Sequence, residues 1–157
     1  MSSYIDRLEK NLSDKVSVLE NIYESDRRII ESVNSSQTGI EIYDEYMMEQ
    51  DSYLSRLDEL DQEYDVIYAY IEKYREELSG VSADRRSHIV TLSKEIEGKL
   101  IAVNDIEERV RKLVEVHFNN RKSAIQASRK NAKTLQDRYR SASIFAVREN
   151  TILDIVN

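Results

Sequence analysis

The sequence contains no cysteine, no proline and no tryptophan, and only three of its 157 residues are glycine. Without cysteine the chain can form no disulfide framework, no cysteine-ligated zinc site and no thiol nucleophile, and this composition fits a reducing cytoplasm. The scarcity of glycine leaves no glycine-rich loop that could hold a phosphate group. A proline-free, glycine-poor sequence is typical of long, uninterrupted helices.

Long hydrophobic runs are absent as well. The longest that we find is VIYAYI at 66–71, which is far shorter than the roughly 18 residues that a membrane-spanning helix requires. The first residues, MSSYIDRLEKNL, lack the apolar region of a secretory signal peptide. We therefore expect a cytoplasmic protein with no membrane insertion.

What the chain does contain is charge. Charged residues make up 34% of the sequence and hydrophobic residues 40%, with a formal net charge of −7, and this length suits one domain. The predicted fold class is all-α, an elongated antiparallel, coiled-coil-like bundle of three long helices in a single domain over 1–157. The helices are expected at about 3–34, 39–79 and 82–140, with a C-terminal helical overhang or tail over 141–157.

Apolar residues recur at steps of three and four in each segment, which is the helical pattern. The stripe of the first segment comprises Ile5, Leu8, Leu12, Val16, Leu19, Ile22, Ile29 and Val33. Asp26 is the one polar residue that falls on this stripe. The second segment keeps a seven-residue repeat through Leu60, Ile67 and Tyr74, and such a repeat requires a partner helix along its length.

Short polar stretches separate the three segments, namely NSSQTG at 34–39 and SGVS at 79–82. In the second stretch, Gly80 is placed to adopt a left-handed conformation after the helix, and Ser82 is placed to cap the next one. Gly98 lies inside the third segment, where a glycine marks a close helix contact or a slight bend.

The short second turn predicts that the second and third helices are antiparallel neighbours, with residue 65 near residue 97. The third helix then extends beyond the second, and the first is too short to cover residues past about 122. This overhang carries an apolar stripe formed by Ile125, Ala132, Leu135, Tyr139 and Phe145. The sequence leaves open whether a second copy of the chain, the tail folded back, or an amphipathic segment of another protein covers that stripe.

Charge is distributed unevenly along the chain. Residues 1–80 have a net charge of −12 and residues 81–157 a net charge of +5. Locally, the stretch 41–65 holds ten acidic residues against one arginine, whereas 119–148 holds eight basic residues against one aspartate. These runs are either solvated helix faces or an acidic face that clamps a basic one.

The sequence contains no motif for catalysis or metal binding. His88 and His117 stand 29 residues apart, and neither follows a glutamate by three residues, as the ligands of a di-iron helical bundle would. We expect no enzyme, no cofactor and no metal, and the pI of about 5.0 argues against a nucleic-acid partner. Seven of the ten tyrosines lie between Tyr43 and Tyr74, and we expect their rings to pack into helix seams with the hydroxyls in water.

Two long runs of the sequence resemble FlgN-type flagellar export chaperones, which are small, acidic, cytoplasmic proteins made of long antiparallel helices. One is YMMEQDSYLSRLDELDQEYDVIY (46–68), where a charged stretch leads into regularly spaced leucines and a Leu-Asp pair before an aromatic residue. The other is KEIEGKLIAVNDIEERVRKLVEVHFNNRKSAIQASRKNAKTLQDRYR (94–140), with Asn104 in mid-helix and Tyr139 near the end.

This resemblance implies a protein that binds the helical C-terminal region of hook-filament junction proteins and keeps them unassembled until export. The family binds its clients mainly through its C-terminal helical region, which corresponds here to the stretch from Ile125 to Phe145. The alternative is a structural coiled-coil protein without a client, whose overhangs pair in a homodimer or larger homo-oligomer. FliT-type chaperones share this composition and length, and the sequence does not separate the two types.

Overall fold

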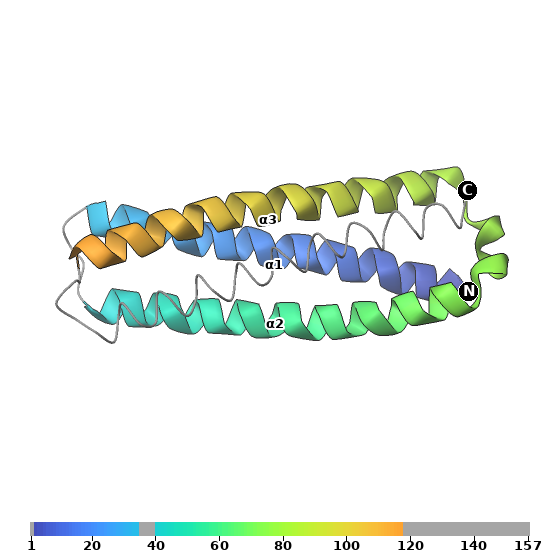
Figure 1. The fold of residues 1–157 in the computed structure, drawn as a ribbon, viewed down its shortest axis with the longest axis horizontal. Helices are drawn as coiled ribbons and strands as arrows, with labels where there is room; N and C mark the ends of the chain where they lie inside the picture. Colours follow the sequence, from blue (N-terminus) through green and yellow to red (C-terminus); the bar gives the residue numbers. More distant parts are fainter. Residues whose placement is uncertain (1, 35–39, 118–157) are drawn as a thin grey trace.

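The computed structural model describes residues 2–34 and 40–117, and all of these except Val81 and Ser82 lie in helix or turn. Helix α1 spans Ser2–Asn34 and α2 spans Ile40–Lys73, followed by a 3₁₀ helix, η1, over Arg75–Gly80. Helix α3 spans Ala83–His117. The three long helices lie side by side as an elongated bundle (Figure 1), and the predicted all-α helical-bundle class is confirmed.

Helix α1 lies between the other two helices (Figure 1). Both α2 and α3 pack along α1, but no Cα atom of α2 comes within 8 Å of one in α3. The predicted pairing of the second helix with the third is therefore wrong. Instead α3 runs parallel to α1, as the ion pairs Asp6–Arg85 and Glu20–Lys99 show by their equal sequence offsets.

The predicted apolar stripes form the core of this bundle. All eight apolar stripe residues of α1 are buried, and Asp26 is fully buried among them. A larger cluster joins the first two thirds of α1 to the second half of α2 and the first two thirds of α3. A smaller cluster at the other end joins Ile29, Ile30 and Val33 to Tyr43 and Val110, among others. Helix α1 takes the central place because it also buries residues beside its stripe, including Asn11 and Ser25.

The connection between α2 and α3 differs in detail from the prediction. Helix α2 ends at Lys73, about six residues early, and the chain continues as η1. Ser82 caps α3 as predicted, because its Oγ accepts the backbone N–H of Arg85 at 3.2 Å. Gly80 does not adopt a left-handed conformation, and a Cβ added at Gly98 would meet nothing within 4 Å. The left-handed conformation predicted for Gly80 is therefore wrong, and Gly98 does not mark a close helix contact.

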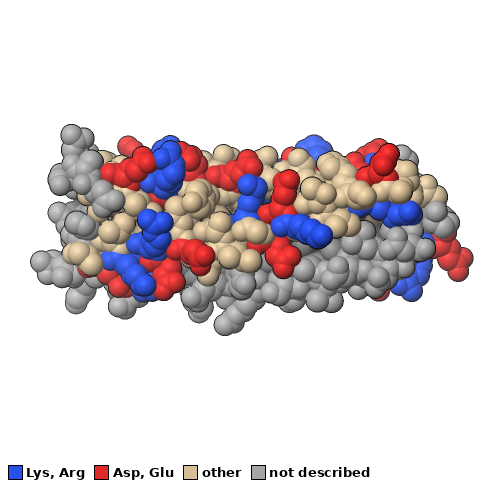
Figure 2. Space-filling model, turned by 90° about the horizontal axis from the view of Figure 1, so that it is seen from above, with Lys and Arg blue, Asp and Glu red and all other residues tan. Residues whose placement is uncertain are grey.

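Polar side chains also bind the helices together. The Asn11 Nδ2 group donates to the backbone carbonyl of Leu60 at 2.8 Å, linking α1 to α2 within the core. On the other flank of α1, Arg85 of α3 pairs with Glu9 at 3.0 Å. Cationic and anionic side chains lie next to one another on the face that Figure 2 shows, so the described bundle presents no broad field of one sign there.

Candidate functional site

The stripe predicted to bind a partner lies outside the described residues. This holds for each of its members, namely Ile125, Ala132, Leu135, Tyr139 and Phe145. The overhang and the tail over 141–157 likewise lie outside that part of the chain. The described bundle ends at His117, and its own candidate sites are a buried polar cluster and two surface clefts.

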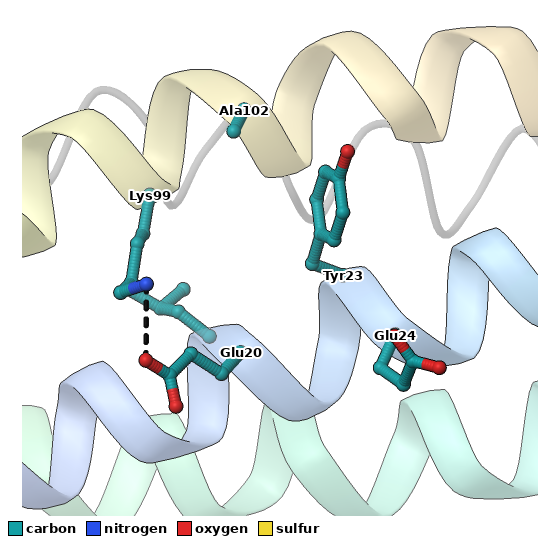
Figure 3. Close-up of a pocket in the computed structure, with 6 residues that line it drawn as sticks. Glu20, Tyr23, Glu24, Lys99 and Ala102 are labelled. Atoms are coloured by element: carbon teal, nitrogen blue, oxygen red, sulfur yellow. Dashed lines mark ion pairs between the residues drawn. The ribbon is translucent and has the colours of Figure 1, made fainter.

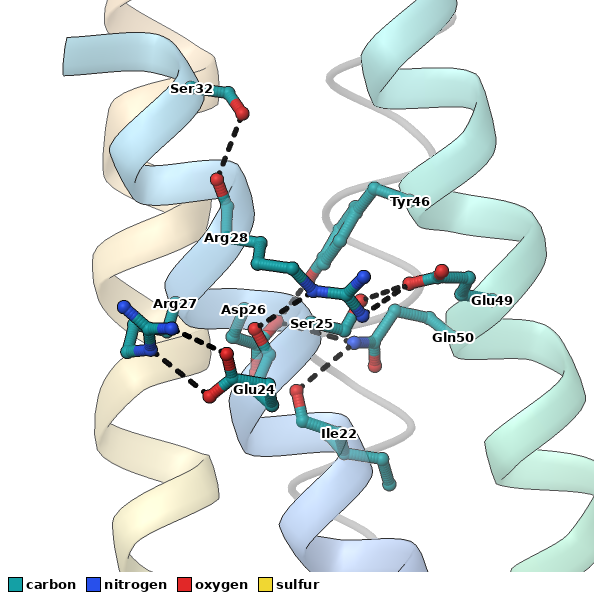
Figure 4. Close-up of polar contacts among 10 residues, drawn as sticks. All are labelled: Ile22, Glu24, Ser25, Asp26, Arg27, Arg28, Ser32, Tyr46, Glu49 and Gln50. Atoms are coloured by element: carbon teal, nitrogen blue, oxygen red, sulfur yellow. Dashed lines mark hydrogen bonds and ion pairs between the residues drawn. The ribbon is translucent and has the colours of Figure 1, made fainter. Parts of the chain in front are cut away.

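The buried polar cluster joins all three helices near the end of the bundle where α3 finishes. Asp26 of α1 is 0% exposed, Glu107 of α3 is 3% exposed, and Tyr46 of α2 is 5% exposed. The Tyr46 hydroxyl reaches both carboxyl groups: it contacts Asp26 Oδ1 and lies 2.9 Å from Glu107 Oε2. In Figure 4, Tyr46 points from α2 toward Asp26 on α1.

A fourth residue, Gln50 of α2, completes this cluster. Its Nε2 group donates to Asp26 Oδ1 at 3.4 Å and to the backbone carbonyl of Ile22 at 3.5 Å (Figure 4). Asp26 Oδ2 and Gln50 Oε1 have no hydrogen-bond partner within the described part of the chain. Buried polar atoms are normally satisfied because leaving one without a partner costs about 1–3 kcal/mol. The cluster is therefore polar but incompletely bonded.

Geometry requires a proton in this cluster beyond the one on Tyr46. A phenol hydroxyl carries one hydrogen, so it can donate to only one of the two carboxyl oxygens that it touches. The other carboxyl must supply the second hydrogen, and so one of the two acids is neutral. The pKa of Asp26 agrees with this conclusion. Burial raises this pKa most, and the charge of Glu107 raises it further, to about 10. Burial also raises the pKa of Tyr46 well above its ordinary value.

One signal of this cluster is visible in the sequence. Asp26 interrupts an otherwise apolar stripe, and a charge at a core position needs a partner or a proton. The partners could not be found from the sequence, because Tyr46 and Glu107 are 61 residues apart and the parallel packing of α3 on α1 was not expected. Tyr43, Tyr46 and Tyr64 are buried in helix seams as predicted, but the Tyr46 hydroxyl is bonded inside the core and is not in water.

A surface cleft of about 360 Å³ lies between α1 and α3. It is lined by Leu19, Glu20, Tyr23, Glu24, Lys99 and Ala102. Lys99 Nζ lies 3.0 Å from Glu20 Oε1, and Tyr23 stands beside this pair (Figure 3). Lys99 neutralises Glu20, and Glu24 pairs with Arg27 outside the cleft. The uncharged lining residues are Leu19, Tyr23 and Ala102.

A smaller cleft of about 190 Å³ lies between α1 and α2. Glu49 accepts hydrogen bonds there from Ser25 Oγ at 2.8 Å and from Arg28 at 3.2 Å (Figure 4). These bonds join the two helices across the cleft. Over residues 2–34 and 40–117, no group of three or more histidine or acidic side chains is arranged to hold a metal ion.

Comparisons with known proteins add no relative. A scan against protein-family models matched no family, and searches of curated proteins and of solved structures found no similar protein. None of the three described helices combines the length and apolarity that crossing a membrane requires. A functional assignment for this chain must therefore be argued from its own residues and geometry.

Proposed function

We propose that this chain is a cytoplasmic export chaperone or a closely similar helix-binding adaptor. Its client would be the helical C-terminal region of a flagellar hook-filament junction protein. The site is the amphipathic stretch that carries Ile125, Ala132, Leu135, Tyr139 and Phe145. The proposal draws its family from the resemblance of residues 46–68 and 94–140 to FlgN-type chaperones.

The observation that carries this proposal is that the apolar stripe of α1 is already covered by α2 and α3. Its stripe is buried from Ile5 to Val33, with α2 packed on one flank and α3 on the other. The apolar positions beyond residue 118 therefore require a cover other than α1. A helical client could supply it, with apolar burial contributing roughly 25 cal/mol per Å² before ordering costs.

The test is light scattering coupled to size exclusion. The protein is measured alone and mixed with the C-terminal segment of a hook-filament junction protein from the same genome. We expect a monomer that forms a defined complex with this segment. A stable dimer or tetramer that ignores the segment would overturn the export role and favour the structural coiled-coil alternative.

Two variants locate the site. Leu135→Asp and Tyr139→Asp each place a charge on the apolar stripe and are expected to abolish the complex with little loss of helicity. Ile101→Asp is the matched control, because Ile101 is 44% exposed on α3 and the same charge there stays in water. Unchanged affinity in both stripe variants would move the site elsewhere, and equal loss in the control would show that the effect is not local.

A further inference from the structure

The side of the bundle between α2 and α3 carries no helix of the described chain. Both helices pack on α1, yet no Cα atom of one lies within 8 Å of a Cα atom of the other. Figure 1 shows α2 and α3 on opposite sides of α1. We call this surface the α2–α3 face and define it by the residues below.

On α2, the seven-residue repeat separates the two flanks. Glu49, Arg56, Glu63 and Tyr70 are spaced by seven, and each of them contacts α1. Each of them stands one residue before a buried residue of α2. We call these buried residues the core row, and they are Gln50, Leu57, Tyr64 and Ile71. The residues that directly follow the core row are rotated by about 100° around the helix, in the direction opposite to the residues that contact α1. That second flank therefore faces away from α1 along the same length.

The second flank of α2 is uniformly acidic. Its five positions are Asp44, Asp51, Asp58, Asp65 and Glu72, and all five side chains are exposed. We call these residues the acidic row. Between this row and the core lie Met47, Leu54, Asp61 and Tyr68, which are buried or half-buried. Asp61 pairs with Lys15 of α1 at 3.3 Å. The other three positions form an apolar strip along α2, with the acidic row as its rim.

The facing flank of α3 is identified by Glu107, which bonds to Tyr46 of α2. Leu100 and Val114 lie seven residues before and after Glu107, on the same face of the helix. Both are buried. The α2–α3 face therefore comprises Met47, Leu54, Tyr68, Leu100 and Val114, with the acidic row at its edge.

We propose that the chain's own C-terminal segment, residues 118–157, docks on the α2–α3 face. Helix α3 ends at His117, at the end of the bundle where α2 begins, because Val110 and Val114 pack in one cluster with Tyr43 and Tyr46. Residues after His117 thus start beside the α2–α3 face. The 40 remaining residues could reach roughly 60 Å as a helix, which exceeds the roughly 51 Å length of the 34-residue α2.

Charge and spacing identify this segment as the occupant. Residues 118–157 carry eight basic and three acidic side chains, opposite in sign to the acidic row. Ile125, Ala132 and Tyr139 are spaced by seven, which is the repeat of the acidic row and of the apolar strip beside it. When these three residues pack against the apolar strip, the basic side chains of the segment come next to the acidic row. The docking does not depend on the export role, and a client that binds the same stripe would have to displace the segment from this face.

Carbodiimide cross-linking tests the docking on the full-length protein alone. This reagent joins a lysine to a carboxylate in direct contact, and the segment offers Lys122, Lys130 and Lys133. An equal mixture of unlabelled and ¹⁵N-labelled protein separates links within a chain from links between chains. We expect links from these lysines to the acidic row within single chains. Links only between chains would place a second copy on the face, and no link to the row would also overturn the docking.

Hydrogen exchange on a charge-reversed variant gives a second readout. With Asp51→Lys and Asp58→Lys together, the amides of 118–157 are expected to exchange at least tenfold faster, while α1 stays protected. The matched control reverses two exposed charges of α2 that lie outside the acidic row, Glu45→Lys and Glu59→Lys, and should exchange as the unaltered protein does. Equal exchange of the segment in all three proteins would refute the docking.

Discussion

The buried carboxyl pair makes the stability of this bundle depend on pH, and Asp26→Asn is the variant that reveals it. In the folded chain, burial and the neighbouring Glu107 raise the pKa of Asp26 to about 10. In the unfolded chain the same carboxyl titrates near 4. Between these two values the folded state holds a proton that the unfolded state releases, so the free energy of unfolding falls as pH rises.

The size of the effect follows from linkage. One proton held only by the folded state lowers the free energy of unfolding by about 1.4 kcal/mol per pH unit. From pH 5 to pH 8 this amounts to about 4 kcal/mol, a large part of the roughly 5–15 kcal/mol by which a domain is stable. Asparagine does not titrate, yet its carbonyl can still accept the hydrogen bonds from Tyr46 and Gln50. We therefore expect Asp26→Asn to be increasingly stable relative to the unaltered protein as pH rises.

The assay is urea unfolding followed by circular dichroism at 222 nm, at several pH values from 5 to 8. The difference in unfolding free energy between Asp26→Asn and the unaltered chain should grow by about 4 kcal/mol across this range. Asp105→Asn, at an exposed position of α3, is the control and should leave the pH profile unchanged. If the unfolding free energies of Asp26→Asn and the unaltered protein change with pH in parallel, the inference that one carboxyl of the cluster is protonated is refuted.

Three further substitutions test the packing by the same urea assay. Gly98→Ala should stabilise the protein by about 1 kcal/mol, because the added methyl meets no atom within 4 Å; destabilisation would mean that the helix is distorted there. Leu60→Ala, at a fully buried position, should cost about 2–5 kcal/mol, and a smaller loss would show that the core collapses around the cavity. Lys15→Ala should cost about 2 kcal/mol, because buried Lys15 lies over the Tyr64 ring and pairs with Asp61 at 3.3 Å; no loss would mean that neither contact stabilises the fold.

The positions and inward faces of the helices were determined by the sequence itself. Apolar spacing placed the first helix at about 3–34, and the structure has it at Ser2–Asn34. Ser82 caps α3 where the pattern indicated. Such features are local, because periodicity and capping depend on residues within one or two turns of the helix.

Only the tertiary structure decided which helices are neighbours. A stripe specifies which side of a helix is buried but not which partner buries it, and the predicted contact between the second and third helices was replaced by contacts of each with α1. The same limit applies to the polar cluster. Asp26 could be seen to need a partner, but its proximity to Tyr46 and Glu107 arises from the parallel packing of α3 on α1, which brings together residues that are remote in the chain.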